Sequence, residues 1–148
     1  WAKESGTRQD IVITGVDIGN IIRTKGAIYA GIAVMLRSLG IEMADVEQVF
    51  IGGDFGQHIN VEGAIQIGLL PDLPWDRFSF LGNTSLSGAY HALISRQARA
   101  QAEDVVGMLT YFELIAEPSF MDEFSAALFL PHTNMGLFPS LKAEMEKG

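Results

Sequence analysis

The chain has 148 residues, of which 48% are apolar, and this is enough to build one domain with a hydrophobic core. Its formal net charge of −8, with scattered lysines and arginines, argues against nucleic acid as the main partner, because phosphate backbones are bound by clustered basic residues. The absence of cysteine excludes disulfides, thiolate zinc sites and cysteine-ligated iron–sulfur clusters within the chain, and it fits a reducing, cytoplasmic compartment. No apolar run approaches the roughly 18 residues of a membrane helix, so we expect no membrane partner.

The first elements predicted along the chain are a short strand and a long helix. The β-branched run within Asp10–Thr14 indicates the strand. Thr14 and Asp17 are spaced as a capping box at the start of a helix. Apolar residues then recur at helical spacing from Val16 to Leu39, and Gly40 is a typical residue after a helix end. We expect this helix to pack on a sheet.

Two buried strands are predicted next, and each leads through a glycine-rich turn into a capped helix. The first strand is Gln48–Ile51, and its helix runs from a cap at Asn60 to about Leu69. The second strand is Arg77–Leu81, and its helix runs from Asn83 or Thr84 to about Ser95. The other predicted elements are a helical turn at Ala44–Glu47, a helix at Ala98–Val106, a strand at Leu109–Leu114 and a helix at Met121–Leu130 capped by Ser119. Alternating strands and helices indicate an α/β fold with right-handed crossovers.

The turn Gly52–Gly56 is the strongest functional signal in the chain. Glycines allow backbone to approach a ligand that a Cβ would block. The turn has neither the Gly-Lys-Ser/Thr ending of a Walker loop nor the spacing of a dinucleotide-binding fingerprint. Taken alone, it is equally well interpreted as a tight connection without a ligand.

The second junction, Gly82–Ala89, places small polar groups at the start of a helix. Backbone N–H groups and the helix dipole favour an anionic or polar ligand there. Ordinary capping by Asn83 or Thr84 explains the same residues. Two such junctions at the carboxyl ends of strands together suggest a nucleotide-type site.

Other titratable residues give weaker signals. Lys25 interrupts an apolar helix and either faces a ligand or is a snorkelling or salt-bridged side chain. His58, His91 and His132 are far apart without metal-ligand spacing, so no metal site is expected, and His132 is interpreted as a structural hydrogen-bonding residue. Acidic pairs such as Asp122/Glu123 are interpreted as solvated helix faces.

Five segments in order along the chain carry a family resemblance. The turn at Phe50–Gly56 resembles the adenosine motif of the actin-like ATPases, the superfamily of acetate and sugar kinases, heat-shock chaperones and actin. More narrowly, the chain from about Ile13 to Leu141 is similar to the C-terminal part of the reductive activators of corrinoid proteins. The segments that carry this are Asp17 with Lys25–Ile32, Gly52–Gly56, Ile67–Pro71, Gly82–Ala89 and Phe129–Thr133.

The resemblance implies a fold and a function. The fold would be α/β, the second lobe of a ribonuclease-H-like, actin-like ATPase domain, with a mixed sheet flanked by helices. Residues 1–148 would form that single lobe, with flexible ends at 1–9 and 140–148. Members of the family carry an N-terminal cysteine-bound iron–sulfur domain and a two-lobed ATPase domain, and they use ATP to return an inactive Co(II) corrinoid protein to Co(I).

The same resemblance implies cofactors and partners. The partners would be nucleotide and a corrinoid protein, and a homodimer is a further candidate. ATP with Mg²⁺ would act in the full-length protein, whose iron–sulfur cluster and first-lobe phosphate motifs have no match here. The chain begins at Trp1 without an initiator Met, so we expect a fragment of a longer protein or a processed product. Because half of the phosphate clamp would be missing, we do not expect it to hydrolyse ATP alone.

The nucleotide-binding residues that the resemblance implies lie mainly in the two junctions. They are Gly52, Gly53, Asp54, Phe55, Gly56, Asn83, Thr84, Ser85 and Lys25. Asp54 departs from the small or neutral residue expected in the turn, because a carboxylate near phosphates is unfavourable unless it points away or reaches a metal or ribose. No catalytic residue is assigned.

Two alternative functions remain open. A lobe of a sugar- or acyl-kinase-like phosphotransferase would share the adenosine motif, and its acceptor pocket would lie mostly in the first lobe. A partner-docking or dimerising module would keep the fold without using the nucleotide contacts.

Overall fold

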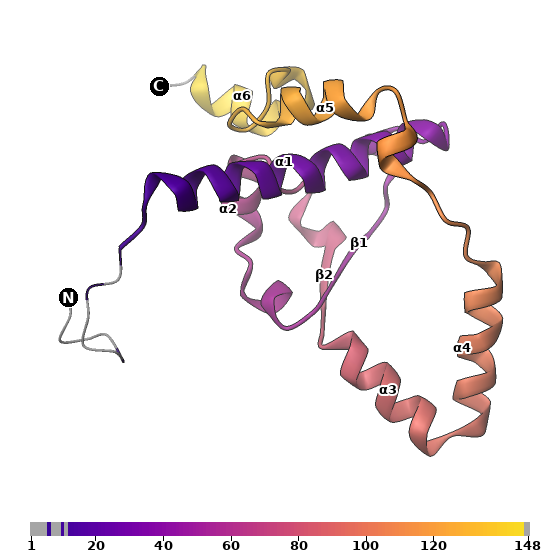
Figure 1. The fold of residues 1–148 in the computed structure, drawn as a ribbon. Helices are drawn as coiled ribbons and strands as arrows, with labels where there is room; N and C mark the ends of the chain where they lie inside the picture. The colour runs from indigo at the N-terminus through magenta and orange to yellow at the C-terminus, as the bar shows by residue number, and fades with distance from the viewer. Residues whose placement is uncertain (1–5, 7–9, 11, 147–148) are drawn as a thin grey trace.

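A single long helix, α1 (Gly15–Ser38), forms the axis of the computed structural model, which describes residues 6, 10 and 12–146 (Figure 1). The Thr14 side chain accepts from the backbone N–H of Asp17, and the Asp17 carboxylate accepts from the backbone N–H of Thr14 at 2.8 Å. Gly40 follows the helix with a φ of 67°, a conformation that glycine adopts without strain. The predicted capping box and helix end are thus confirmed.

The strand expected at Asp10–Thr14 is wrong for the described residues. Asp10 and Val12–Thr14 have no strand structure, and Ile11 lies outside the described residues. Val12 and Ile13 are exposed, because neither of the two strands among the described residues pairs with them. β-Branched residues favour a strand only where a ladder partner exists.

The two strands that flank the glycine turns are confirmed, and they pair with each other. β1 (Val49–Gly52) and β2 (Phe78–Gly82) form a parallel pair, joined by a crossover that includes α2 (Val61–Gln66). Within the described residues the expected mixed sheet is a two-stranded parallel sheet with helices packed around it, so the fold is α/β. Asn60 caps α2 by accepting from the N–H of Gly63 at 2.8 Å, as predicted.

The core lies where α1, α2, β2 and α5 (Phe120–Ala127) meet. Gly26 permits close contact between α1 and α5, because a Cβ there would lie 3.2 Å from the carbonyl oxygen of Ala127. This explains why a glycine is tolerated within an otherwise apolar helix. The buried hydrophobic cluster consists of Tyr29, Ala64, Ile65, Leu70, Leu73, Phe78, Ala127 and Phe138.

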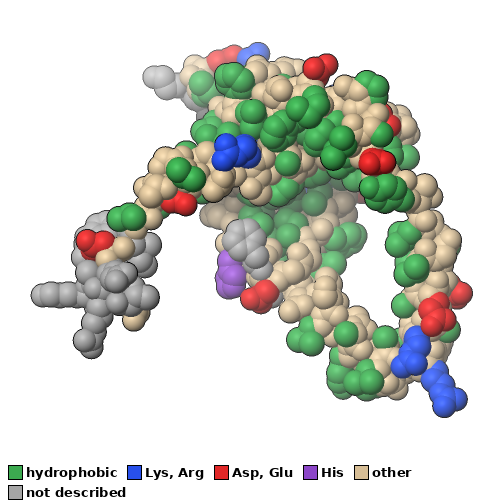
Figure 2. Space-filling view, in the orientation of Figure 1, with side chains coloured by type: hydrophobic (Ala, Val, Ile, Leu, Met, Phe, Trp, Pro, Cys, Tyr) green, Lys and Arg blue, Asp and Glu red, His purple; other side chains and the backbone are tan. Residues whose placement is uncertain are grey.

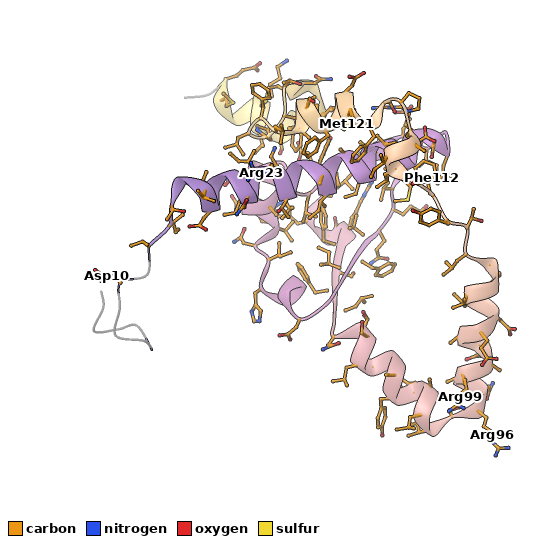
Figure 3. The ribbon with its side chains drawn as sticks, viewed as in Figure 1. Asp10, Arg23, Arg96, Arg99, Phe112 and Met121 are labelled. Atoms are coloured by element: carbon orange, nitrogen blue, oxygen red, sulfur yellow. The ribbon has the colours of Figure 1, made fainter. Side chains whose placement is uncertain are left out.

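A helical hairpin stands out from this body. It consists of α3 (Thr84–Ile94) and α4 (Arg96–Met108), and its residues are half-buried or exposed. Arg96 and Arg99 lie at its tip in Figure 3, where the Arg99 guanidinium donates to the carbonyl of Ala92 at 3.1 and 3.3 Å. Both helices match the predicted ones, and we call this hairpin the α3–α4 arm.

The strand expected at Leu109–Leu114 is wrong. Residues 109–113 form an irregular connection, and Leu114–Ala116 forms a turn of 3₁₀ helix. Tyr111 is 84% exposed, because the segment bridges from the arm back to α1 without a neighbouring strand. The alternating aromatic and β-branched residues predicted a strand, but no described strand lies beside this segment to pair with it.

The C-terminal segment folds back over α1 and ends in α6 (Pro139–Met145), which overlaps the range 140–148 for which a flexible end was expected. Asp72 holds the start of α6 by accepting from the N–H and hydroxyl of Ser140, both at 2.8 Å. None of the described helices is long and apolar enough to cross a membrane. The other 3₁₀ turns are Met43–Asp45, Phe55–His58, Trp75–Arg77 and Met135–Leu137.

Gly68→Ala is expected to destabilise the fold strongly. Gly68 has a φ of 72°, and a Cβ there would overlap the carbonyl oxygen of Pro131 and lie 2.8 Å from its carbonyl carbon. Strain and backbone overlap together should cost about 3 kcal/mol or more of unfolding free energy, measured by denaturant titration. Gly63→Ala in α2 is the matched control, because its Cβ would meet Asn60 at an ordinary 3.5 Å. Equal effects of the two substitutions would contradict the assigned contact.

Candidate functional site

The parallel pairing of β1 and β2 brings the two glycine junctions side by side. Gly52 is aligned with Gly82 in the strand register, and the N–H of Gly53 donates to the carbonyl of Gly82 at 2.7 Å. A register irregularity between Ile51 and Gly52 falls at this point. Because the carboxyl ends of parallel strands share one edge, residues from positions 52–56 and 83–85 form one surface.

The first junction is packed too tightly for most side chains. A Cβ at Gly52 would lie 2.9 Å from the hydroxyl oxygen of Thr84, and a Cβ at Gly56 would lie 2.7 Å from the Ile51 Cγ2 atom. Gly53 differs, because its φ is 101° and, apart from its two chain neighbours, no atom of the described residues lies within 4 Å of the Cβ position. Gly52 and Gly56 therefore allow the turn to close. Gly53 leaves its Cα face open, while its N–H donates to Gly82 and its carbonyl accepts from Gly56.

The second junction supplies polar groups at the start of α3. Asn83 is the N-cap and accepts from the N–H of Leu86 at 3.0 Å, which confirms the capping interpretation for that side chain. Thr84 and Ser85 are exposed at the first turn of the helix. Their hydroxyls and backbone N–H groups form the polar side of the surface.

Asp54 and Phe55 belong to the first junction. Asp54 is exposed, makes no side-chain capping bond and precedes the 3₁₀ turn that begins at Phe55. The structure thus places eight of the nine predicted binding residues along adjoining segments. The remaining one, Lys25, is engaged elsewhere.

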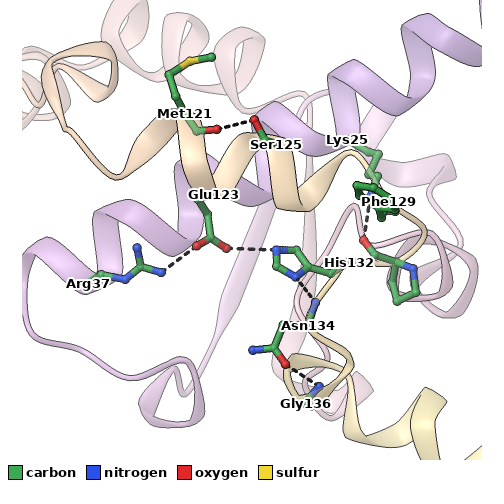
Figure 4. A network of polar contacts seen from close by, with 10 residues as sticks. Lys25, Arg37, Met121, Glu123, Ser125, Phe129, His132, Asn134 and Gly136 are labelled. Carbon is green, nitrogen blue, oxygen red and sulfur yellow. Dashed lines mark hydrogen bonds and ion pairs between the residues drawn. The ribbon is translucent and has the colours of Figure 1, made fainter.

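Lys25 is held within the protein by backbone carbonyls. The ammonium donates to the carbonyl oxygens of Phe129 and Pro131, the latter at 2.7 Å, and the residue is 1% exposed (Figure 4). Burial lowers the pKa of Lys25 from 10.5 to about 8. Its hydrogen bonds link α1 to the segment that follows α5, so its observed contacts are structural.

A buried carboxylate on α5, which contacts both α1 and the segment after α5, was missed from the sequence. Glu123 accepts from Arg37 at 2.8 Å and faces the Nε2 atom of His132 at 3.3 Å (Figure 4). Interpreting Glu123 as part of a solvated face was wrong, because its side chain is 11% exposed. Glu123 lies on the side of α5 that packs on α1. The sequence of this short helix does not show which of its faces is the buried one.

The structural role expected for His132 is confirmed. Its Nδ1 atom accepts from the backbone N–H of Asn134 at 3.0 Å, which leaves the proton of the neutral ring on Nε2, facing Glu123. Burial lowers the pKa of His132 although Glu123 acts in the opposite direction. The ring also packs against Tyr29, at 5.4 Å between centroids.

A cavity of about 450 Å³ lies between the C-terminal half of α1 and the turn at Pro71–Pro74. Its two guanidinium groups are already bonded within the protein: Arg37 pairs with Glu123, and Arg77 donates to the carbonyls of Ala44 and Val46. No residue of either glycine junction lines it. The paired junctions therefore remain the candidate site.

Comparison with known proteins identifies the family. Residues 1–142 match the family model described as the C-terminal domain of RACo, the ASKHA domain. The chain belongs to this family. The RACo C-terminal domain is an actin-like domain, so the fold class and the family resemblance expected from the sequence are confirmed.

Two relatives show how the chain relates to longer proteins. It is 32% identical over 123 residues to the corrinoid activation enzyme RamQ of Eubacterium limosum, covering 83% of this chain and 21% of that protein. It superimposes on a reductive activator for corrinoid, iron-sulfur protein with a TM-score of 0.89 and 48% identity, covering 95% of this chain and 22% of the other. The chain thus spans about a fifth of each relative.

Gly52→Ala is expected to destabilise the β1–α3 contact, and Thr84→Ala is expected to relieve the strain. The added Cβ would lie 2.9 Å from the Thr84 hydroxyl oxygen and 3.4 Å from its methyl carbon, and Thr84→Ala removes both atoms. The single Gly52 variant should lose about 1–3 kcal/mol of unfolding free energy. In the double variant, denaturant titration should recover most of that loss; purely additive losses would contradict the contact.

The stability contributed at Lys25 is expected to rise with pH above about 8. Its folded pKa is about 8 and its unfolded value 10.5, so the unfolded chain binds more protons in this window and unfolding becomes harder as pH increases. From pH 8 to 9.5, wild type should gain about 1–2 kcal/mol relative to Lys25→Met, which does not titrate. The comparison ends at pH 9.5 because burial raises the pKa of Tyr29 to about 12. At higher pH the unfolded chain loses its tyrosine protons before the folded chain does, so a further rise in pH lowers the free energy of unfolding. A pH-independent difference would contradict the assigned burial.

Proposed function

We propose that the paired glycine junctions bind the adenosine and phosphate side of ATP as one half of a two-lobed site. The observation that carries this is their juxtaposition at one sheet edge, in a chain of the RACo C-terminal family. The open Cα face of Gly53 would lie against the nucleotide, and Thr84 and Ser85 would offer hydroxyl and N–H donors nearby.

The residues of this surface suit a nucleotide, but they do not form a site for a metal ion or for an iron–sulfur cluster. The Cα face of Gly53 leaves space where a side chain would stand, and the start of α3 is suited to a polar or anionic group. Asp54 is the carboxylate of this surface, and the described residues contain no cluster of three metal-ligating side chains. The chain has no cysteine to hold an iron–sulfur cluster. Magnesium and the cluster would therefore be held mainly by residues outside this chain.

In the longer protein, the domain would serve ATP-dependent reductive activation of a corrinoid protein. RamQ is named a corrinoid activation enzyme and the other relative a reductive activator for corrinoid, iron-sulfur protein, and this chain matches one part of each. ATP held between this lobe and another would favour a closed arrangement, and closure would be coupled to docking of the corrinoid protein. One electron, passed from the iron–sulfur cluster that residues outside this chain would hold, would then convert the Co(II) centre of that partner to Co(I).

The activity is tested with the full-length protein, a Co(II) corrinoid protein and a one-electron reductant. Absorbance should show Co(I) accumulating only when ATP is present. Equal Co(I) formation with and without ATP would overturn the proposed activity. Calorimetric titration with ATP and ADP tests binding separately, and no heat from a folded protein would favour a docking module instead.

Asp54→Asn is expected to tighten ATP binding by about two- to fivefold. The exposed carboxylate makes no capping bond and adds negative charge to a surface proposed to face phosphates. The gain should shrink as salt is added, because exposed charges are screened. Asp76→Asn, which removes an exposed carboxylate before β2, is the control and should leave affinity unchanged. Weaker binding by the Asp54 variant would instead indicate a contact to ribose or metal.

A further inference from the structure

The cavity between the C-terminal half of α1 and the turn at Pro71–Pro74 has the size of a small-molecule site. Its volume of about 450 Å³ lies within the range of ligand pockets in proteins. It belongs to the body of the molecule, where hydrophobic side chains gather over α1 and α5 in Figure 2. Apolar side chains from several segments of the chain line it, so the apolar part of a ligand would be removed from water there. They are Ala33, Leu36, Ile41, Met43, Leu73 and Leu137.

Tyr29 lines this cavity with an unpartnered hydroxyl. The residue is 2% exposed, and its ring packs against His132 and Phe138, both at 5.4 Å between centroids. Burial raises the pKa of Tyr29, and the charges of Glu123 and Asp72, which also line the cavity, act in the same direction. The hydroxyl therefore lies on the cavity side of the ring, and it bonds to no other described residue. Because a buried tyrosine hydroxyl usually has a hydrogen-bond partner, this one is suited to bond a molecule in the cavity.

The charges around the cavity favour a cation over an anion. Both of its guanidinium groups already have acceptors, because Arg37 pairs with Glu123 and Arg77 donates to two backbone carbonyls. Asp72 accepts from the backbone N–H and the hydroxyl of Ser140, which carry no charge, and no described residue forms an ion pair with it. An incoming cation would therefore meet an uncompensated carboxylate. The charged residues that line the cavity are Glu42, Asp72, Glu123, Arg37 and Arg77, which leaves negative charge in excess.

We infer that this cavity binds a small organic ammonium compound with an apolar body. The ammonium donates to the Tyr29 hydroxyl oxygen beside the carboxylate of Asp72, and the apolar body packs against side chains such as Leu36 and Leu73. An ammonium offers donors and no acceptor, so it complements the oxygen atoms at this end of the cavity. A carboxylate of the same shape would meet the excess negative charge instead. The inference is independent of the proposed nucleotide surface, because no residue of either glycine junction lines the cavity.

Three probes of similar shape test the charge preference by calorimetric titration of the full-length protein. Phenethylammonium carries the proposed charge, phenethyl alcohol replaces the ammonium with a hydroxyl, and phenylpropionate replaces it with a carboxylate. At neutral pH the ammonium should bind about tenfold more tightly than either of the others. Two results would overturn the inference: no saturable binding of the ammonium at millimolar concentrations, or binding of the carboxylate that is as tight as that of the ammonium.

Substitutions test whether the probe occupies this cavity. Tyr29→Phe retains the buried ring and removes the hydroxyl, and Asp72→Asn removes the charge while leaving an oxygen for Ser140. Each should weaken phenethylammonium binding by about three- to tenfold, with thermal unfolding as the check that the variant is folded. Tyr111→Phe, at a position that is 84% exposed, and Asp76→Asn, also exposed, are the matched controls and should leave the affinity unchanged. Unchanged affinity in either cavity variant, or displacement of the probe by ATP, would place the probe elsewhere and overturn the inference.

Discussion

The register of one pair of parallel strands determines where the candidate site lies. Gly52 is aligned with Gly82, and the bond from the Gly53 N–H to the Gly82 carbonyl fixes both turns at the same sheet edge. The contact of Gly52 with Thr84 then sets the start of α3 against the first turn. A shift of one residue would separate these groups and place a side chain where only glycine fits.

The body behind this edge is held together by contacts of α1 that have no part in the proposed nucleotide surface. Lys25 bonds to two carbonyls of the segment after α5, and Gly68 packs against one of those same carbonyls, that of Pro131. This links α1, the end of α2 and the C-terminal segment at one point. A buried ammonium with two carbonyl acceptors is costly to desolvate, and it stabilises the fold only while this geometry is intact.

Local signals in the sequence were sufficient for the elements that depend on neighbours along the chain. Thr14 with Asp17, Asn60 and Asn83 are capping residues whose bonds span three positions, so their helices could be predicted. The strands expected at Asp10–Thr14 and Leu109–Leu114 failed because a strand needs a partner that local pattern does not supply. Lys25 bonds to a residue 106 positions away and Glu123 to one 86 positions away, and a single sequence does not reveal such contacts.

The central claim is that the two glycine junctions act as one ligand surface, and hydrogen exchange of the full-length protein tests it most directly. On titration with ATP, backbone amides in peptides covering 52–56 and 83–86 should slow together, with the same midpoint. Peptides from the tip of the α3–α4 arm should serve as the unchanged reference. Slowing of one junction without the other, or of neither while ATP is bound, would contradict the account.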